Sequence, residues 1–391
     1  MHQKRKYSLK NFLDILAVKS GLSTGTIARK VRCHISTALR YLRELKTAEQ
    51  VIEQRISNTI NLWKLAGKRI LLIDVDSKIS NLALMKISSY HKSKGDSIVL
   101  IHGSHVGVTD PSDKIYGSII YKKNKHLLDY LHSAYPDIPI DIGGSGYDLK
   151  KELPDDIENL KPDYSLYQEN DYSIGFSSRG CIRNTKTCPF CVVPIKEGKF
   201  RRTQHPSEWY NPDYDKIVFL DNNILADKEY FMEITDWCIE KKLKLQFNQG
   251  LDIRKMDEDI ARRILEMPKH GMVNFAWDHI EDEAIIREKI DLLKRVGFTK
   301  NKLRAKVQFY IYVNDDSEAE YQSGVYRCRE LKKLHCNSYV MYNIDNERTQ
   351  RIKDLQRWSI RKILYWLHDI EFYKKDIQAT DILKRLHGTT A

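Results

Sequence analysis

The chain has 391 residues, of which 41% are hydrophobic and 30% are charged, a balance typical of a globular protein with two or three domains. No apolar run approaches the length needed to cross a bilayer, and no apolar stretch with a cleavage site follows the basic N-terminus, so we expect a cytoplasmic protein with no membrane partner. The net charge is +12, and residues 1–67 hold 13 Lys and Arg against 4 Asp and Glu. This asymmetry predicts an N-terminal module that binds a polyanion.

Residues 8–67 have the pattern of a helix-turn-helix followed by a β-hairpin. A first apolar helix is followed by a short helix at residues 24–31, a turn and a third helix. Strand-prone runs at 51–55 and 59–65 predict the hairpin. The inward stripe of the third helix is expected to contain Ile35, Ala38, Leu39, Leu42 and Leu45.

The segment GLSTGTIARKVRCHISTALRYLREL resembles the helix-turn-helix of winged-helix regulators. This resemblance, together with the positive charge, implies contacts with DNA or RNA. The expected contact residues are Lys30, Ser36, Thr37, Arg40, Tyr41 and Arg55. Winged helices also hold leader peptides, and we favour nucleic acid because a helix comes first and the charge is strongly positive.

Residues 68–152 alternate between short apolar runs and helical segments. We expect strands at 69–75, 97–102, 117–121 and 139–142, with helices at 81–92 and 125–134. Such alternation predicts a parallel, Rossmann-like sheet. Three glycines after the last strand are expected to form a turn of close backbone approach, namely Gly143, Gly144 and Gly146.

The pieces DVDSKISNLALMKISSYHKSKGD and IDIGGSGYD resemble the cobalamin-binding-like domain that precedes the catalytic barrel of many radical S-adenosylmethionine (SAM) enzymes. The Asp-x-His-x-x-Gly loop that ligates cobalt in that family is absent, because Asp74-Val75-Asp76 runs into Ser77-Lys78. Cobalamin stays an alternative, and we favour a domain without it. His102 and His105 are expected to be ordinary loop histidines.

A polar linker is predicted at residues 153–172, and the stretch after it places Cys181, Cys188 and Cys191 within eleven residues. Three clustered thiolates predict a metal site. A structural zinc ion closes with four protein ligands, whereas an iron–sulfur cubane held by three cysteines keeps one iron open. The alternatives are a zinc site completed by His205, Cys328 or Cys336, or three unrelated thiols.

The loop SIGFSSRGCIRNTKTCPFCVVPIKEGKF resembles the cluster loop of the radical SAM superfamily, in the branch that includes the methylthiotransferases. Its spacing is C-x6-C-x2-C, where the family usually has C-x3-C-x2-C. The resemblance implies a 4Fe-4S cluster on the three cysteines, S-adenosyl-L-methionine on the open iron, and a one-electron donor such as flavodoxin or ferredoxin. No second cysteine triplet is present, which argues against a standard methylthiotransferase.

Residues 173–347 are predicted to form a partial (βα)6 barrel within an α/β protein. The expected strands are 173–177, 216–220, 244–248, 272–277, 306–313 and 338–342. Each is followed by polar residues, and βα barrels place ligand sites at strand C-termini. FLDNNILAD and FNQGLDIRKM resemble strand ends that approach SAM or substrate in the superfamily. The resulting cofactor-binding candidates are Phe190, Asp221, Asn222, Asn223, Asp252, Arg254 and Asp278.

The last part, residues 348–391, is expected to form a long packing helix at 351–373 and another helix at 376–387. The favoured function is a radical SAM enzyme that acts on or near nucleic acid. One alternative is an iron–sulfur redox sensor that regulates transcription, and the other is a radical SAM enzyme that modifies a peptide or protein. The predicted barrel favours an enzyme, because a sensor needs no set of polar strand ends.

Overall fold

The protein is described here by a computed structural model, which covers residues 7–18, 21–48, 50–57, 60–103, 112–343 and 346–373. The chain forms two compact units, Met1–Glu158 and Asn159–Ala391, which divide within the predicted linker. Both combine helices with sheets, and their larger sheets are parallel, so the predicted α/β class is confirmed. None of the described helices combines the length and apolar character needed to span a bilayer.

The first unit begins with three helices and a small antiparallel sheet. The helices are α1 (Leu9–Val18), α2 (Thr24–Val31) and α3 (Ile35–Thr47), and the strands are β1 (Leu22–Ser23), β2 (Val51–Arg55) and β3 (Asn61–Leu65), in the order β1-β3-β2. Trp63 of β3 is fully buried among the helices, and its indole N–H donates to Thr24 Oγ1 at 2.8 Å. A single aromatic residue therefore joins the sheet to the helices.

The predicted burial of α3 side chains is wrong at two positions, Tyr41 and Ile35. Tyr41 is only 2% exposed, stacks on Phe12 with ring centroids 4.9 Å apart, and donates its hydroxyl hydrogen to the carbonyl oxygen of Tyr7. Ile35, expected inside, is 55% exposed. The buried stripe consists of Ala38, Tyr41, Leu42 and Leu45, since the ring of Tyr41 covers α1 while the first helical residue lies at the rim.

The rest of the first unit is a parallel sheet in the order β5-β4-β6-β7. Its strands are β4 (Arg69–Asp74), β5 (Ser97–His102), β6 (Lys114–Ser118) and β7 (Ile140–Gly143), and its helices are α4 (Leu82–Ser93), α5 (His126–Asp129), α6 (Leu131–Ala134) and α7 (Asp155–Glu158). The third strand begins earlier than predicted, because Ile115 and Tyr116 pair with both neighbours. The helix expected at 125–134 is interrupted at Tyr130.

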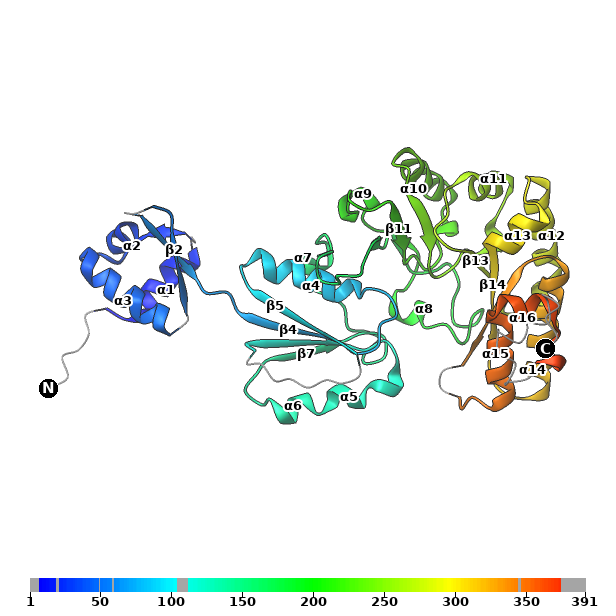
Figure 1. Cartoon of the computed structure of the whole chain (residues 1–391), viewed down its shortest axis with the longest axis horizontal. Helices are drawn as coiled ribbons and strands as arrows, with labels where there is room; N and C mark the ends of the chain where they lie inside the picture. The colour runs from blue at the N-terminus through cyan, green and yellow to red at the C-terminus, as the bar shows by residue number, and fades with distance from the viewer. Residues whose placement is uncertain are drawn as a thin grey trace, which may run out of the picture. The chain divides into compact units, whose positions relative to one another are not determined.

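Helices cover the two faces of this sheet, as Figure 1 shows for α4 on one side and α5 with α6 on the other. Leu71 and Ile73 of β4 belong to one core cluster with Leu128 and Leu131 of α5 and α6. Successive side chains of a strand point to opposite faces, so Ile70 and Leu72 are buried on the α4 side. A strand buried on both faces explains the uninterrupted apolar run of β4.

The second unit contains two parallel sheets of three strands each. Strands β8 (Ser173–Gly175), β11 (Lys216–Phe219) and β12 (Lys244–Phe247) form the first, in the order β12-β11-β8, and β13 (Val273–Ala276), β14 (Val307–Val313) and β15 (Asn337–Tyr342) form the second, in chain order. A parallel bridge pairs Leu251, just after β12, with Phe275 of β13. The six predicted strands therefore all exist, and their carboxyl ends point the same way within each sheet.

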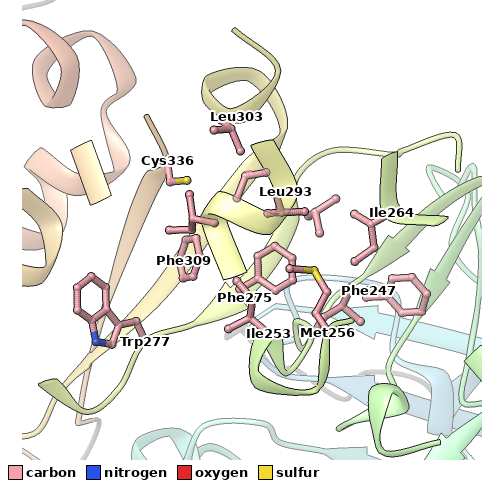
Figure 2. Packing of buried hydrophobic residues seen from close by; sticks show 14 of the residues in the cluster. Phe247, Ile253, Met256, Ile264, Phe275, Trp277, Leu293, Leu303, Phe309 and Cys336 are labelled. Carbon is pink, nitrogen blue, oxygen red and sulfur yellow. The ribbon is translucent and has the colours of Figure 1, made fainter. Parts of the chain in front are cut away.

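Helices connect these strands and bury one shared core. They are α9 (Pro206–Trp209), α10 (Lys228–Glu240), α11 (Glu258–Glu266), α12 (Glu283–Arg295), α13 (Lys300–Lys306) and α14 (Glu318–Lys333). Figure 2 shows Phe275 of β13 and Phe309 of β14 packed beside Leu293 of α12 and Met256, all members of one buried cluster. This core spans both sheets and positions their strand ends relative to one another.

The single long helix expected at 351–373 is broken. The structure has α15 (Gln350–Ile360), α16 (Lys362–Leu367) and a 3-10 turn at Ile370–Phe372. The helix breaks at Arg361, whose backbone is extended, with ψ at 92°. The ring centroids of Trp358 and Tyr365, on either side of the break, lie 5.2 Å apart in the core. The helix predicted at 376–387 and His105 lie outside the described residues.

A buried arginine on α14 ties strand ends together. Arg327 is 1% exposed, and its guanidinium donates to the carbonyl oxygens of Trp277, Asp278 and Tyr312 at 2.7 to 3.1 Å. Trp277 and Asp278 follow β13, and Tyr312 lies near the end of β14. One cation thus satisfies carbonyl groups that would otherwise lack donors in a dry interior.

We predict that Arg327→Met lowers the free energy of unfolding by about 3 kcal/mol, because three buried carbonyl oxygens lose a charged donor. The measurement is urea unfolding followed by tryptophan fluorescence. Arg295→Met, at an exposed position of α12, is the matched control and should change the free energy by less than about 0.5 kcal/mol. Equal stability of the two variants would contradict a structural role for Arg327.

Candidate functional site

The three clustered cysteines lie on a loop that leaves the carboxyl end of β8. The base of the loop is closed by the antiparallel strand pair β9 (Ser178–Arg179) and β10 (Arg201–Arg202). The backbone of Cys181 also forms an isolated β-bridge with that of Lys199. Gly180 has φ at +79°, and a Cβ there would lie 2.2 Å from the carbonyl oxygen of Lys199. Glycine is therefore required where the two segments touch just before the first cysteine.

A buried carboxylate holds the start of this loop. Asp221, after β11, is 2% exposed, and its oxygens accept hydrogen bonds from the backbone N–H and the hydroxyl of both Ser177 and Ser178, at 2.6 to 3.0 Å. Burial raises the pKa of Asp221, and the four donors oppose that rise. Asp221 was predicted to contact a cofactor, but its carboxylate is instead engaged in positioning the loop.

The two asparagines after Asp221 reach the cysteine loop itself. Asn222 Oδ1 accepts from the backbone N–H of Gly180 at 2.9 Å, and Asn223 Nδ2 lies 3.4 Å from Cys181 Sγ as a donor. Asn223 Oδ1 is buried and has no hydrogen-bond partner among the residues that the structure describes. An unsatisfied buried acceptor is costly, so this oxygen is available to a donor on a bound ligand.

Arg183 connects two of the sulfurs to the next strand end. Its backbone N–H lies 3.4 Å from Cys181 Sγ, and its guanidinium lies 3.8 Å from Cys188 Sγ. The same guanidinium is 3.3 Å from Asp252, which also pairs with Arg254 at 2.7 Å. The predicted residues Asp252 and Arg254 thus belong to a charged network that begins at the cysteine loop.

The third cysteine is half-buried and lies near other ionisable groups. Burial raises the pKa of the Cys191 thiol, and the nearby Cys188, Cys181 and Asp278 add to the rise. The metal-free chain therefore favours a neutral thiol at Cys191, whereas a bound metal ion would deprotonate it. Burial also raises the pKa of Asp278, and Arg327 is the largest influence that opposes it.

Aromatic residues close one side of the cysteine loop. Phe190 stacks on Tyr312 of β14 with ring centroids 3.9 Å apart, and His279 lies 6.3 Å from Phe190. One face of Phe190 is thus covered by the protein and is not open to an adenine ring. The buried His279 Nε2 has no hydrogen-bond partner in the described part of the chain, and it is a second polar atom that a ligand could satisfy.

The three thiols are the type of ligand that an iron–sulfur cluster requires, but in the structure they are not close enough together to bind one. Three thiols share one loop and N–H donors point at two of the sulfurs, which is the hydrogen bonding that tunes such clusters. Among the described residues, no three His, Cys, Asp or Glu side chains are arranged so that they could hold a metal ion. Coordination therefore requires the three thiols to converge.

The residues named for a zinc alternative do not extend this set. Cys328 and Cys336 are fully buried in the hydrophobic core, where Tyr365 donates its hydroxyl hydrogen to both of their carbonyl oxygens. His205 caps α9, with its ring nitrogen 2.8 Å from Ser207 Oγ. Among the described residues, none of the three joins the loop cysteines in a group that could hold a metal ion.

The glycines that follow β7 pack closely against the chain itself. A Cβ on Gly144 would lie 2.2 Å from the carbonyl oxygen of Ile119, and one on Gly146 would lie 2.6 Å from the carbonyl carbon of Tyr121. The close approach made by these glycines is to the chain itself. His102 is half-exposed at the end of β5, 3.9 Å from the carboxylate of Asp74.

The predicted nucleic-acid contacts are mostly exposed. Lys30 at the end of α2, Ser36 and Arg40 on α3, and Arg55 at the end of β2 are all exposed, and Thr37 is half-buried. Ser36 Oγ lies 2.7 Å from His34 Nδ1, so its hydroxyl is engaged in the cap of α3. Tyr41 is removed from this surface by its burial.

Sequence reasoning missed several residues of the site. Arg183 stands inside the cysteine loop and carried a signal, since a cation between clustered cysteines favours thiolates. Ser177, Ser178 and Tyr312 carried no such signal, because serines and strand tyrosines are common in any fold. Their roles depend on partners more than forty residues away for the serines and more than a hundred for Tyr312.

We predict that Asp221→Asn loosens the cysteine loop, because the new amide NH2 group faces donors and leaves buried N–H and O–H groups unpaired. The expected loss of stability is about 2 kcal/mol, with faster hydrogen exchange at the Ser177 and Ser178 amides. Asp213→Asn, at an exposed position, is the control and should leave both measurements unchanged. Unchanged protection in Asp221→Asn would contradict the anchoring role.

The sequence was compared with protein-family models and with curated proteins, and neither comparison gave a match.

Proposed function

We propose that this chain is a radical SAM enzyme in which Cys181, Cys188 and Cys191 hold a 4Fe-4S cluster. In this proposal the two sheets of the second unit form a partial (βα)6 barrel, and SAM lies at the carboxyl ends of its strands. The first unit would contribute a winged helix, formed by α1 to β3, and a Rossmann-like domain that lacks cobalamin. The resemblance of the cysteine loop to that superfamily supports the proposal.

The single observation that carries the proposal is how the cysteine loop meets the strand ends. The loop leaves the first parallel strand, and Asn223 of the second strand end donates toward Cys181 Sγ at 3.4 Å. Arg183 then links the sulfurs to Asp252 at the third strand end. Ligand sites of βα barrels form at this edge, so the thiols lie where a barrel enzyme binds its substrate.

A reduced cluster held by the three cysteines would supply the electron that cleaves SAM to methionine and a 5′-deoxyadenosyl radical. The chain itself holds the sulfurs and excludes water. Asn223 and Arg183 donate hydrogen bonds that stabilise negative charge on sulfur. Phe190 and Tyr312 form an apolar wall, and the buried Asn223 Oδ1 and His279 Nε2 are available to polar groups of a ligand.

The proposed partner of the N-terminal region is DNA or RNA. Two observations support this partner. Residues 1–67 contain 13 basic and 4 acidic residues, and Lys30, Arg40 and Arg55 are exposed. These cations lie on the second helix, the third helix and the hairpin. A winged helix uses the same three elements to contact a duplex.

We predict that the reduced, anaerobically reconstituted protein forms 5′-deoxyadenosine from SAM and that Cys181→Ala and Cys191→Ala do not. The expected loss is complete, because each variant removes a ligand from a site with only three. The measurements are iron content and product detected by mass spectrometry. Cys33→Ala removes a thiol in the first unit and is the matched control, which should retain both iron and product.

The other outcomes of this assay separate the alternatives. A bound cluster without product would favour a redox-sensing regulator, and zinc in place of iron would overturn the proposal. Iron and product that persist in Cys181→Ala would show that the loop is not the ligand set.

We predict that Lys30→Ala combined with Arg40→Ala weakens binding of a DNA duplex. The slope of log K against log salt concentration should fall by about two, because each cation neutralises one phosphate. Fluorescence anisotropy at several salt concentrations measures this effect, and iron content should not change. The control combines Lys241→Ala with Lys353→Ala, which removes equal charge from exposed sites of the second unit. If the affinity changes neither with salt concentration nor in the Lys30→Ala/Arg40→Ala variant, a peptide partner would be indicated instead.

A further inference from the structure

A second candidate site lies at the opposite end of the strands from the cysteines. A pocket of about 210 Å³ is lined by Leu265, Lys269, Phe298, Lys302 and Lys306. Lys269 follows α11, and its backbone forms an isolated parallel β-bridge with Leu245 near the start of β12. Lys306 directly precedes β14. The pocket is therefore at the amino ends of the strands, whereas the cysteine loop leaves a carboxyl end.

Three of the five residues that line this pocket are lysines. None of Lys269, Lys302 and Lys306 forms an ion pair with another residue in the described part of the chain. Lys269 Nζ donates to the carbonyl oxygens of Leu265 and Met267 at 3.0 and 2.8 Å, and Lys302 Nζ reaches that of Gly297 at 3.5 Å. The carbonyl groups orient the lysines but do not neutralise them.

The electrostatic cost of this arrangement is visible at Lys269, which is half-buried. Burial lowers the pKa of Lys269 to about 8, and the like charges of Lys306 and Lys302 contribute to the lowering. An anion in the pocket would replace lost hydration and offset the repulsion among the three cations. The site is thus more favourable with an anion than without one.

Basic residues continue over the surface of α13 beyond the pocket. Lys300 and Arg304 are exposed on this helix, and the guanidinium of Arg304 lies 4.4 Å from the centroid of the Trp366 ring. The pKa of His335 is lowered mainly by burial. The positive charges of Arg304, Lys300 and Lys294 lower it further, so these cations surround one histidine. Lys300 and Arg304 alternate with Lys302 and Lys306 along this helix, so they face away from the pocket and do not line it.

We propose that the pocket formed by Lys269, Lys302 and Lys306 binds a phosphate group. The three lysines that line the pocket offer ammonium donors, which match the charge and the several acceptor oxygens of a phosphate. The apolar side chains of Leu265 and Phe298 limit water on one side, which strengthens the attraction. The phosphate belongs either to a nucleic-acid backbone or to a small phosphorylated compound. This site is independent of the cysteine loop.

The first test measures pyrophosphate binding to the full chain by titration calorimetry at low salt. Lys302→Gln combined with Lys306→Gln should weaken binding about tenfold or more, because two charged donors are lost. The control Lys241→Gln with Lys353→Gln has the same net charge and should bind like wild type. Thermal unfolding of both variants verifies that the chain is folded.

The second arm identifies the source of the phosphate. Binding of a single-stranded oligonucleotide is followed by anisotropy, and a backbone ligand predicts that the pocket variant reduces the salt dependence of log K by about two. Placing the pocket variant in the Lys30→Ala/Arg40→Ala background removes any contribution of α2 and α3. Oligonucleotide binding unchanged by the pocket variant, with pyrophosphate binding weakened, would assign the site to a small phosphorylated compound.

A chemical readout tests Lys269 directly. At pH 8 an acetylating reagent should modify Lys269 faster than the exposed Lys241, and pyrophosphate should protect Lys269 selectively. Lys269→Met, which keeps much of the apolar stem, should lose pyrophosphate affinity without unfolding. The proposal is overturned if neither probe binds, or if wild type, the pocket variant and the control bind pyrophosphate equally.

Discussion

The buried carboxylate of Asp221 joins the ends of the first two strands of the second unit. It accepts four hydrogen bonds from Ser177 and Ser178, which directly precede the cysteine loop. A fully desolvated carboxylate tolerates only a well-satisfied geometry, so the backbone on both sides of it is held in place. The next two residues, Asn222 and Asn223, are thereby aimed at the loop.

Polar contacts then extend from this anchor across the strand ends. Arg183 joins the sulfurs to Asp252, Arg254 continues to Asp282, and Arg327 holds the carbonyl groups that follow β13 and β14. The hydrophobic core beneath is shared by both sheets, so these groups are supported by rigid elements. The result is an edge where three thiols lie beside unsatisfied polar atoms, which is the arrangement that supports the proposed chemistry.

The second unit concentrates different chemistry at its two ends. Thiols, carboxylates and amides gather at the carboxyl ends of the strands, whereas Lys269, Lys302 and Lys306 gather at the amino ends. A cation pocket suits a negatively charged ligand, and the thiol loop suits a metal. Separation by the length of a strand lets each site keep its own electrostatic environment, because the interior between them is apolar.

The sequence alone determined the approximate positions of the strands and the place of the cysteine loop, because apolar periodicity and residue spacing are local properties. All six strands of the second unit lie within a few residues of their predicted positions. Only the tertiary structure decided what Tyr41, Asp221 and Arg361 do, since each depends on distant partners. Stacking on Phe12 buries Tyr41, and the two serines occupy Asp221. Packing of Trp358 against Tyr365 accompanies the helix break at Arg361, which helical spacing alone did not predict.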